Sequence, residues 1–148
     1  MIRFEGDRQV PLPPADAWRK LRDARFLVDC IQGAQATGAD ATADVAHCRV
    51  RPNVPFLHGT MELTVRVAEA EEPSAVRVVT VGQGNNASSE VETWLTLTEK
   101  SGGTHIHWTA DVRALGGLLK MAPAVQVQAA AQKLVNETWG LVAQKIGK

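Results

Sequence analysis

The chain has 148 residues, which is most simply one domain spanning residues 1–148. Its 16 basic and 16 acidic side chains balance to zero net charge, which argues against a nucleic-acid partner because such proteins usually carry a basic face. Two cysteines are too few for a disulfide framework and indicate a reducing compartment, so we expect a cytoplasmic protein; no stretch reaches the roughly 18 apolar residues of a membrane span.

The N-terminal segment predicts one strand and two short helices. Residues 1–10 alternate between apolar and polar side chains, as a strand does. Pro14 suits the first turn of a helix, where its missing N–H costs nothing, and Trp18 then lies on the inner face. Residues 25–32 predict a second short helix that ends at Gly33.

The middle of the chain, residues 35–113, predicts about five antiparallel strands. Apolar side chains alternate with polar ones through most of it, and "KSGG" at residues 100–103 predicts a tight hairpin. Several apolar sets are expected to share the inner face of the sheet: Ala46, Cys48 and Val50; Met61, Leu63, Val65 and Val67; and Val91, Thr93, Leu95 and Leu97, facing Ile106, Trp108, Ala110 and Val112.

The last third changes to a helical period. Pro123 is a suitable first residue for a long helix that runs to about Ile146, with an apolar stripe that is rich in alanine in its N-terminal half. Helices segregated from a meander of strands predict an α+β layer architecture. A strongly curved sheet that grips the long helix would bury the apolar face of each and leave space between them.

This order of elements and six sequence segments resemble the START-like (SRPBCC) helix-grip superfamily, and within it most closely the family of the G subunit of carbon monoxide dehydrogenase. The segments are "FEG" at 4–6, "PPADAWRKLRD" at 13–23, "CIQG" at 30–33, "FLHGTMEL" at 56–63, "VGQGNNASSEVETWLTL" at 81–97 and "GTHIHWTADVRALGGLL" at 103–119. The resemblance implies a curved antiparallel sheet wrapped around a long C-terminal helix, with two short helices after the first strand.

The resemblance also carries expectations about function. It implies an accessory subunit of a molybdenum hydroxylase such as carbon monoxide dehydrogenase, which binds a quinone or lipid and works in the cytoplasm or at the periphery of the inner membrane. In the family the "CIQG" segment usually reads Cys-Ile-Pro-Gly, so Gln32 replaces a proline. Cys30 and Ile31 would then face the mouth of the cavity. The alternative for Cys30, which the absence of any nearby feature that would lower its thiol pKa favours, is a small buried hydrophobic residue.

The expected interior is almost wholly apolar, which suits a flat or elongated hydrophobic ligand. We expect binding rather than catalysis, with no cofactor and no metal. The candidate ligand-binding residues are Cys30, Ile31, Cys48, Val50, Phe56, Met61, Leu63, Leu95, Trp108, Met121, Val127 and Leu134.

Other functions remain open alternatives. An enzyme similar to the polyketide cyclases and dehydratases of the superfamily would need Asp29, His58 or Asn53 to point into the cavity. His105 and His107 have a spacing that could hold a metal, but they share a face with polar residues, which favours a solvated convex surface. An interaction protein with a filled core is a third possibility.

A set of basic residues on the two short helices is a candidate surface for an anionic lipid or a partner protein. An ordinary solvated face is the alternative interpretation. The set consists of Arg19, Lys20, Arg22 and Arg25.

Overall fold

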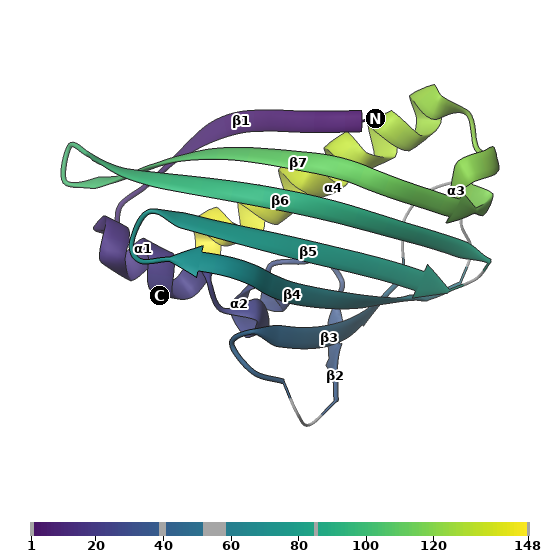
Figure 1. Ribbon diagram of the computed structural model, residues 1–148, viewed down its shortest axis with the longest axis horizontal. Coiled ribbons are helices and arrows are strands. Elements are labelled where there is room, and N and C mark those ends of the chain that lie inside the picture. The colour runs from purple at the N-terminus through teal and green to yellow at the C-terminus, as the bar shows by residue number, and fades with distance from the viewer. Residues whose placement is uncertain (1, 39–40, 52–58, 85, 148) are drawn as a thin grey trace.

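The computed structural model describes residues 2–38, 41–51, 59–84 and 86–147 (Figure 1). Strands and helices follow one another in the expected order. They are β1 (Ile2–Val10), α1 (Pro14–Leu21), α2 (Ala24–Asp29), β2 (Gln35–Thr37), β3 (Val45–Val50), β4 (Met61–Glu71), β5 (Ala75–Gly84), β6 (Ala87–Lys100), β7 (Gly103–Gly117), α3 (Leu118–Met121) and α4 (Ala124–Lys145).

The strands form one curved antiparallel sheet in the order β1-β7-β6-β5-β4-β3-β2. Helix α4 runs along one face of this sheet, while α1 and α2 lie at the end opposite α3 (Figure 1). The α+β helix-grip prediction is therefore confirmed. The first strand pairs with the last, so that β1 and β7 bring the beginning of the chain beside its C-terminal third.

The register of the β6–β7 hairpin agrees with the prediction from the alternating pattern. Leu95 pairs with Trp108 and Leu97 pairs with Ile106, so the apolar sets face the same side of the sheet. Ser101 and Gly102 form the turn, with φ of 54° and 82°. Glycine reaches this left-handed region without the Cβ clash that other residues meet, which accounts for the tight connection.

The region after the first helix differs from the prediction in two respects. Helix α2 ends at Asp29 rather than near residue 32, and the chain turns through Gly33, whose φ is 74°. The described residues of the segment that follows form six strands, β2 to β7, rather than about five, because the three residues of β2 pair with β3. Asp23 caps α2 by accepting a hydrogen bond from the backbone N–H of Arg25.

Helix α4 is anchored mainly towards its ends. Val127 near its start and Trp139 and Val142 near its end are buried, whereas Leu134 in the middle is 45% exposed. Where the helix passes over the sheet, its small side chains Ala130 and Ala131 do not fill the space beneath. The long apolar stripe thus has two roles, because its ends pack against the core and its middle borders a cavity.

Candidate ligand cavity

A cavity of about 620 Å³ lies between the concave face of the sheet and α4. Ligand pockets in proteins commonly measure about 300–1,000 Å³, so a lipid-sized or drug-sized molecule fits by volume. The sheet supplies one wall, with side chains from β3 to β7. Helix α4 supplies the other, and Leu27, Ile31 and Gly33 border the cavity from α2 and the turn after it.

Most of the predicted ligand-binding residues line this cavity. Those that do so are Ile31, Val50, Met61, Leu63, Leu95, Trp108, Val127 and Leu134. They converge from the sheet, from α4 and from the turn after α2, as expected if one concave face meets one helix. Their contact with a ligand remains a prediction.

The two cysteines are not among the cavity-lining residues and correct the predicted set. Both side chains are fully buried, and burial raises the pKa of the Cys30 thiol to about 11 and that of Cys48 to about 11. Cys30 follows the last residue of α2, where its backbone N–H caps the helix. Each cysteine therefore acts as a small packing residue, which was the alternative interpretation for Cys30.

Met121 was also predicted to line the cavity, and its position is different. Its side chain is 82% exposed at the end of α3, outside the cavity. Met121 precedes the break at Ala122 and Pro123 that separates α3 from α4, so it does not belong to the apolar stripe of α4. Phe56 lies outside the described residues.

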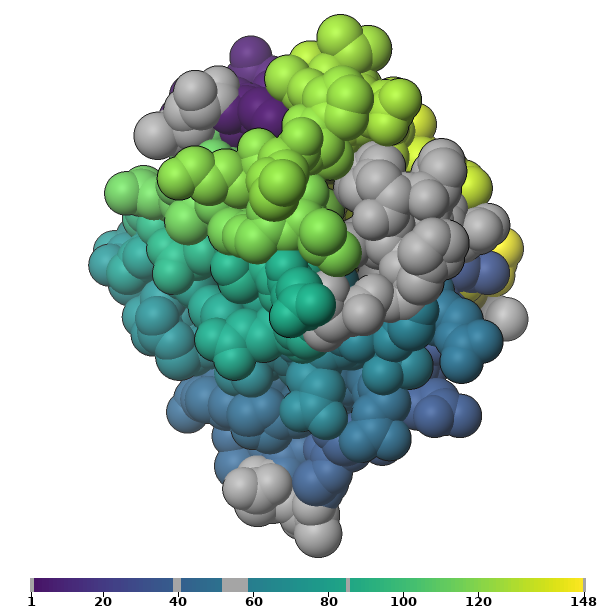
Figure 2. All heavy atoms as spheres, turned by 90° about the vertical axis from the view of Figure 1, so that its right-hand side faces the viewer, coloured from purple at the N-terminus to yellow at the C-terminus, as the bar shows by residue number. Residues whose placement is uncertain are grey.

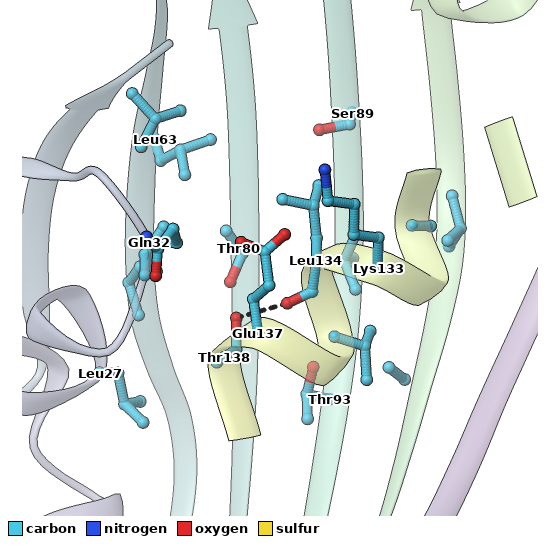
Figure 3. Close-up of a pocket in the computed structure, with 18 of the residues that line it drawn as sticks. Leu27, Gln32, Leu63, Thr80, Ser89, Thr93, Lys133, Leu134, Glu137 and Thr138 are labelled. Carbon is cyan, nitrogen blue, oxygen red and sulfur yellow. Dashed lines mark hydrogen bonds between the residues drawn. The ribbon is translucent and has the colours of Figure 1, made fainter. Parts of the chain in front are cut away.

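Polar side chains also border the cavity, although none of them was among the predicted ligand-binding residues. Figure 3 shows Lys133 and Glu137 on α4 and Thr80, Ser89 and Thr93 on the strands of the sheet. Thr93 was predicted to share the inner face of the sheet, and the same alternation could have identified Thr80 on β5 and Ser89 on β6. Lys133 and Glu137 flank the apolar stripe at a spacing of one helical turn, which is a weaker signal.

Trp108 lies at the contact between β7, β1 and α4. Its ring centroid is 5.8 Å from that of Trp139 on α4, and its indole packs against Gly6 on β1, where an added Cβ would lie 3.0 Å from Cζ2. The indole Nε1 is buried and has no hydrogen-bond partner among the described residues. The residue therefore contributes an aromatic surface to the cavity wall.

The residues considered for catalysis do not assemble in the described cavity wall. Asp29 is exposed at the end of α2 and is not among the lining residues, and its carbonyl oxygen accepts a hydrogen bond from Lys145 Nζ at 2.6 Å. Asn53 and His58 lie outside the described residues. Among the described residues, Glu137 is the carboxylate that borders the cavity.

The paired histidines lie on the outer face of the sheet. His105 Nε2 is 2.9 Å from Asp7 Oδ1, and His107 Nδ1 is 3.0 Å from the same oxygen. These hydrogen bonds lower the pKa of Asp7. Within the described residues, no group of three or more histidine, cysteine, aspartate or glutamate side chains has an arrangement that could hold a metal ion.

The basic set on α1 and α2 is largely neutralised by neighbouring acids. Arg19 pairs with Asp16, Arg22 Nη2 lies 2.6 Å from Asp44 Oδ1, and Arg25 Nη2 lies 2.8 Å from Asp23 Oδ2. The ammonium of Lys20 lies over the ring of Phe26, 5.8 Å from its centroid. This surface therefore presents little net positive charge.

None of the helices in the described part of the chain is both long enough and apolar enough to cross a bilayer. Comparison with known proteins gives a match to a family model and matches to solved structures. No curated protein sequence matches the chain.

Solved structures confirm the fold. A conserved protein from Geobacillus kaustophilus matches with a TM-score of 0.82 at 17% identity, covering 99% of this chain and 95% of its own. A protein from Chromobacterium violaceum matches with a TM-score of 0.68 at 12% identity, covering 99% and 98%. At such low identities, these similarities establish the architecture alone.

The sequence itself matches a family model almost from end to end. The match covers residues 6–147, and the model describes CoxG, the G subunit of carbon monoxide dehydrogenase. The matched region therefore includes the segment around Gly33, the strands β3 to β7 and the whole of α4, which together surround the cavity. The chain belongs to the CoxG family, named for the G subunit of carbon monoxide dehydrogenase.

Proposed function

We propose that this chain binds a hydrophobic small molecule, a quinone or another lipid, in the cavity between α4 and the sheet. The observation that carries the proposal is the cavity itself, which has a volume of about 620 Å³ and a mostly apolar wall. Family membership supports an accessory role beside a molybdenum hydroxylase such as carbon monoxide dehydrogenase. We place the protein in the cytoplasm, at the periphery of the inner membrane.

The energetics favour such a ligand without any ion pair. Burial of roughly 400 Å² of ligand apolar surface is worth about 10 kcal/mol at about 25 cal/mol per Å². Association costs of about 4–15 kcal/mol oppose this gain. Where the association cost is about 4 kcal/mol, the remaining gain of about 6 kcal/mol corresponds to a dissociation constant of roughly tens of micromolar, which suits a carrier that must release its cargo.

The polar part of the cavity wall favours a ligand that is not purely hydrocarbon. Thr80, Ser89 and Thr93 offer hydroxyl groups on the sheet side (Figure 3). A hydroxyl can donate to or accept from a ligand oxygen. A molecule with an apolar body and a few polar atoms, such as a quinone or a fatty acyl compound, would match both kinds of surface.

The first experiment is native mass spectrometry of protein purified without organic solvent, followed by lipid extraction. The expected result is a co-purifying quinone or lipid, or uptake of added menaquinone or fatty acid. Ala131 lines the cavity, so the larger side chain of Ala131→Phe should occupy part of the space that the ligand needs. Uptake should weaken by about tenfold or more, because the ligand would then contact less of the cavity wall.

Ala129 provides the matched control, because it lies on the same helix but is exposed and is not among the cavity-lining residues. Ala129→Phe should retain the uptake of the unmodified protein. Absence of any adduct, together with no uptake of either added lipid, would overturn the carrier proposal. Turnover of a polyketide-like substrate that is lost in Glu137→Gln would instead support the enzymatic alternative.

A further inference from the structure

The wall of the ligand cavity reaches solvent between the middle of α4 and the end of β3. Most of the lining residues are buried or half-buried, and we define the exposed ones as the cavity mouth. They are Gln32, Gly33, Arg51, Lys133 and Leu134. The mouth is therefore built by three segments of the chain, which are the turn after α2, the residue that follows β3 and the middle of α4.

The sheet and α4 place these segments around one opening. Gln35 of β2 pairs with Arg49 of β3, and an extension of this antiparallel register brings Gly33 beside Arg51. Helix α4 contacts β1, at the opposite edge of the sheet. Figure 2 shows the first turns of α4 (yellow-green) beside β1 (purple) and away from β2 and β3 (blue). The helix thus covers the β1 side of the sheet and leaves the mouth on the β3 side.

The charged side chains that border the cavity gather at this mouth. Within the described residues they are Arg51 and Lys133 at the mouth and the half-buried Glu137, one helical turn after Lys133. None of the three forms an ion pair with another described residue. Figure 3 shows Lys133 and Glu137 extending from α4 in the same direction, over the cavity. Two cationic groups against one carboxylate give the mouth an excess of positive charge.

The wall behind the mouth is apolar. Its buried part is formed by side chains such as Met61, Leu95, Trp108 and Val142. A ligand with an apolar body would therefore lie with that body inside and its polar end at the mouth. A neutral polar end would leave both cations to water, whereas an anionic end would accept charge-assisted hydrogen bonds, which are roughly twice as strong as neutral ones.

We propose that the mouth binds the ionised carboxylate of a single-chain amphiphile whose acyl chain occupies the cavity; this assignment deepens the proposed function and rests on it. Arg51 and Lys133 donate to the carboxylate oxygens, and the fork of a guanidinium matches a carboxylate in shape. The Gln32 amide offers a further donor. A doubly charged phosphate monoester fits less well, because Glu137 beside Lys133 repels the second negative charge.

The cavity contains its own reporter, since Trp108 and Trp139 both line it. Titrations followed by tryptophan fluorescence compare dodecanoate with dodecanol, which have equally long chains but differ in the charge of the head group. We expect the unmodified protein to bind dodecanoate about fivefold more tightly than dodecanol, as two solvent-exposed ion pairs allow. This preference should shrink in high salt, because exposed charges are screened.

Removal of both cations at the mouth should abolish the preference. Arg51→Met/Lys133→Met should bind dodecanoate about as weakly as dodecanol and should bind dodecanol like the unmodified protein. The matched control is Arg66→Met/Lys100→Met, which removes the same charge from exposed residues that do not line the cavity and should keep the preference. Equal loss in both double variants would overturn the mouth as the carboxylate site, since it would indicate an effect of net charge alone.

Failure of the carboxylate assignment is distinguishable from failure of the cavity proposal. Equal affinity of the unmodified protein for dodecanoate and dodecanol would overturn the assignment and leave the cavity proposal intact. Tighter binding of dodecyl phosphate than of dodecanoate would overturn the carboxylate in favour of a phosphate head group. No fluorescence change with any of these amphiphiles, together with no uptake of lipid in native mass spectrometry, would overturn both proposals.

Discussion

The indole rings of Trp108 and Trp139 lie 5.8 Å apart between centroids, with their planes inclined by 33°. This contact joins the inner face of β7 to the C-terminal half of α4, and both residues line the ligand cavity. Tilted aromatic pairs at this separation contribute about 0.5–1.5 kcal/mol beyond the area that they bury. The pair therefore holds the helix on the sheet beside the cavity.

Removal of the Trp108 ring should be much more damaging than removal of its nitrogen. Trp108→Ala should lower the free energy of unfolding by about 3–5 kcal/mol, because it opens a cavity beside Trp139. Trp108→Phe should cost less than about 1.5 kcal/mol, since the buried Nε1 has no partner to lose among the described residues. Urea denaturation followed by circular dichroism measures both. An equally large loss for Trp108→Phe would mean that the indole N–H is bonded.

Two glycines should respond to alanine in opposite directions. At Gly6 an added Cβ would lie 3.0 Å from Trp108 Cζ2, so Gly6→Ala should lower the free energy of unfolding by about 1–3 kcal/mol. Gly140 lies inside α4 with no atom of the described residues within 4 Å of an added Cβ, so Gly140→Ala should raise stability by about 0.5–1 kcal/mol. Thermal unfolding of both variants compares the signs directly. A destabilising Gly140→Ala would contradict the open space at that position.

The Arg3–Asp111 pair should make stability depend on pH in the acid range. Arg3 Nε and Nη2 bind the two carboxylate oxygens of Asp111 at 2.6 and 2.9 Å, and this lowers the pKa of the Asp111 carboxyl in the folded state. The unfolded chain then binds more protons between the folded pKa and the ordinary value of about 3.9, so stability rises with pH across that window. The contribution is fully present above the window.

Acid titration of the unfolding free energy tests this expectation. Asp111→Asn should flatten the dependence in the window below about pH 4 relative to the unmodified protein. Arg3→Met should flatten it as well, because the carboxyl loses the group that lowers its pKa. An unchanged slope in both variants would show that the pair does not link folding to protonation.

Both thiols should resist modification in the folded protein. Burial raises the pKa of Cys30 and Cys48 to about 11, so very little thiolate exists at neutral pH, and the side chains are also inaccessible. Titration with a thiol reagent should therefore be slow in buffer and rapid for both cysteines in denaturant. A fast phase from Cys30 in the folded state would restore its predicted place at the cavity mouth.

The sequence by itself was sufficient to predict the fold, because the fold depends on periodicity and turns. The alternation through Leu95 and Leu97 and the turn at Ser101 and Gly102 determine how β6 pairs with β7. A one-residue shift would turn every inward side chain outward, so only one register is compatible with the pattern. The helical stripe after Pro123 likewise predicted α4 and the face that it turns to the sheet.

Only the tertiary structure decided which inward side chains border open space and which are packed. Cys48 and Val50 share a face of β3, yet Val50 lines the cavity and Cys48 does not. Periodicity reports the direction of a side chain but not the distance to the surface opposite, which depends on the curvature of the sheet and on the small residues of α4. Met121 shows the same limit, because it ends the separate helix α3, where its side chain lies on the surface.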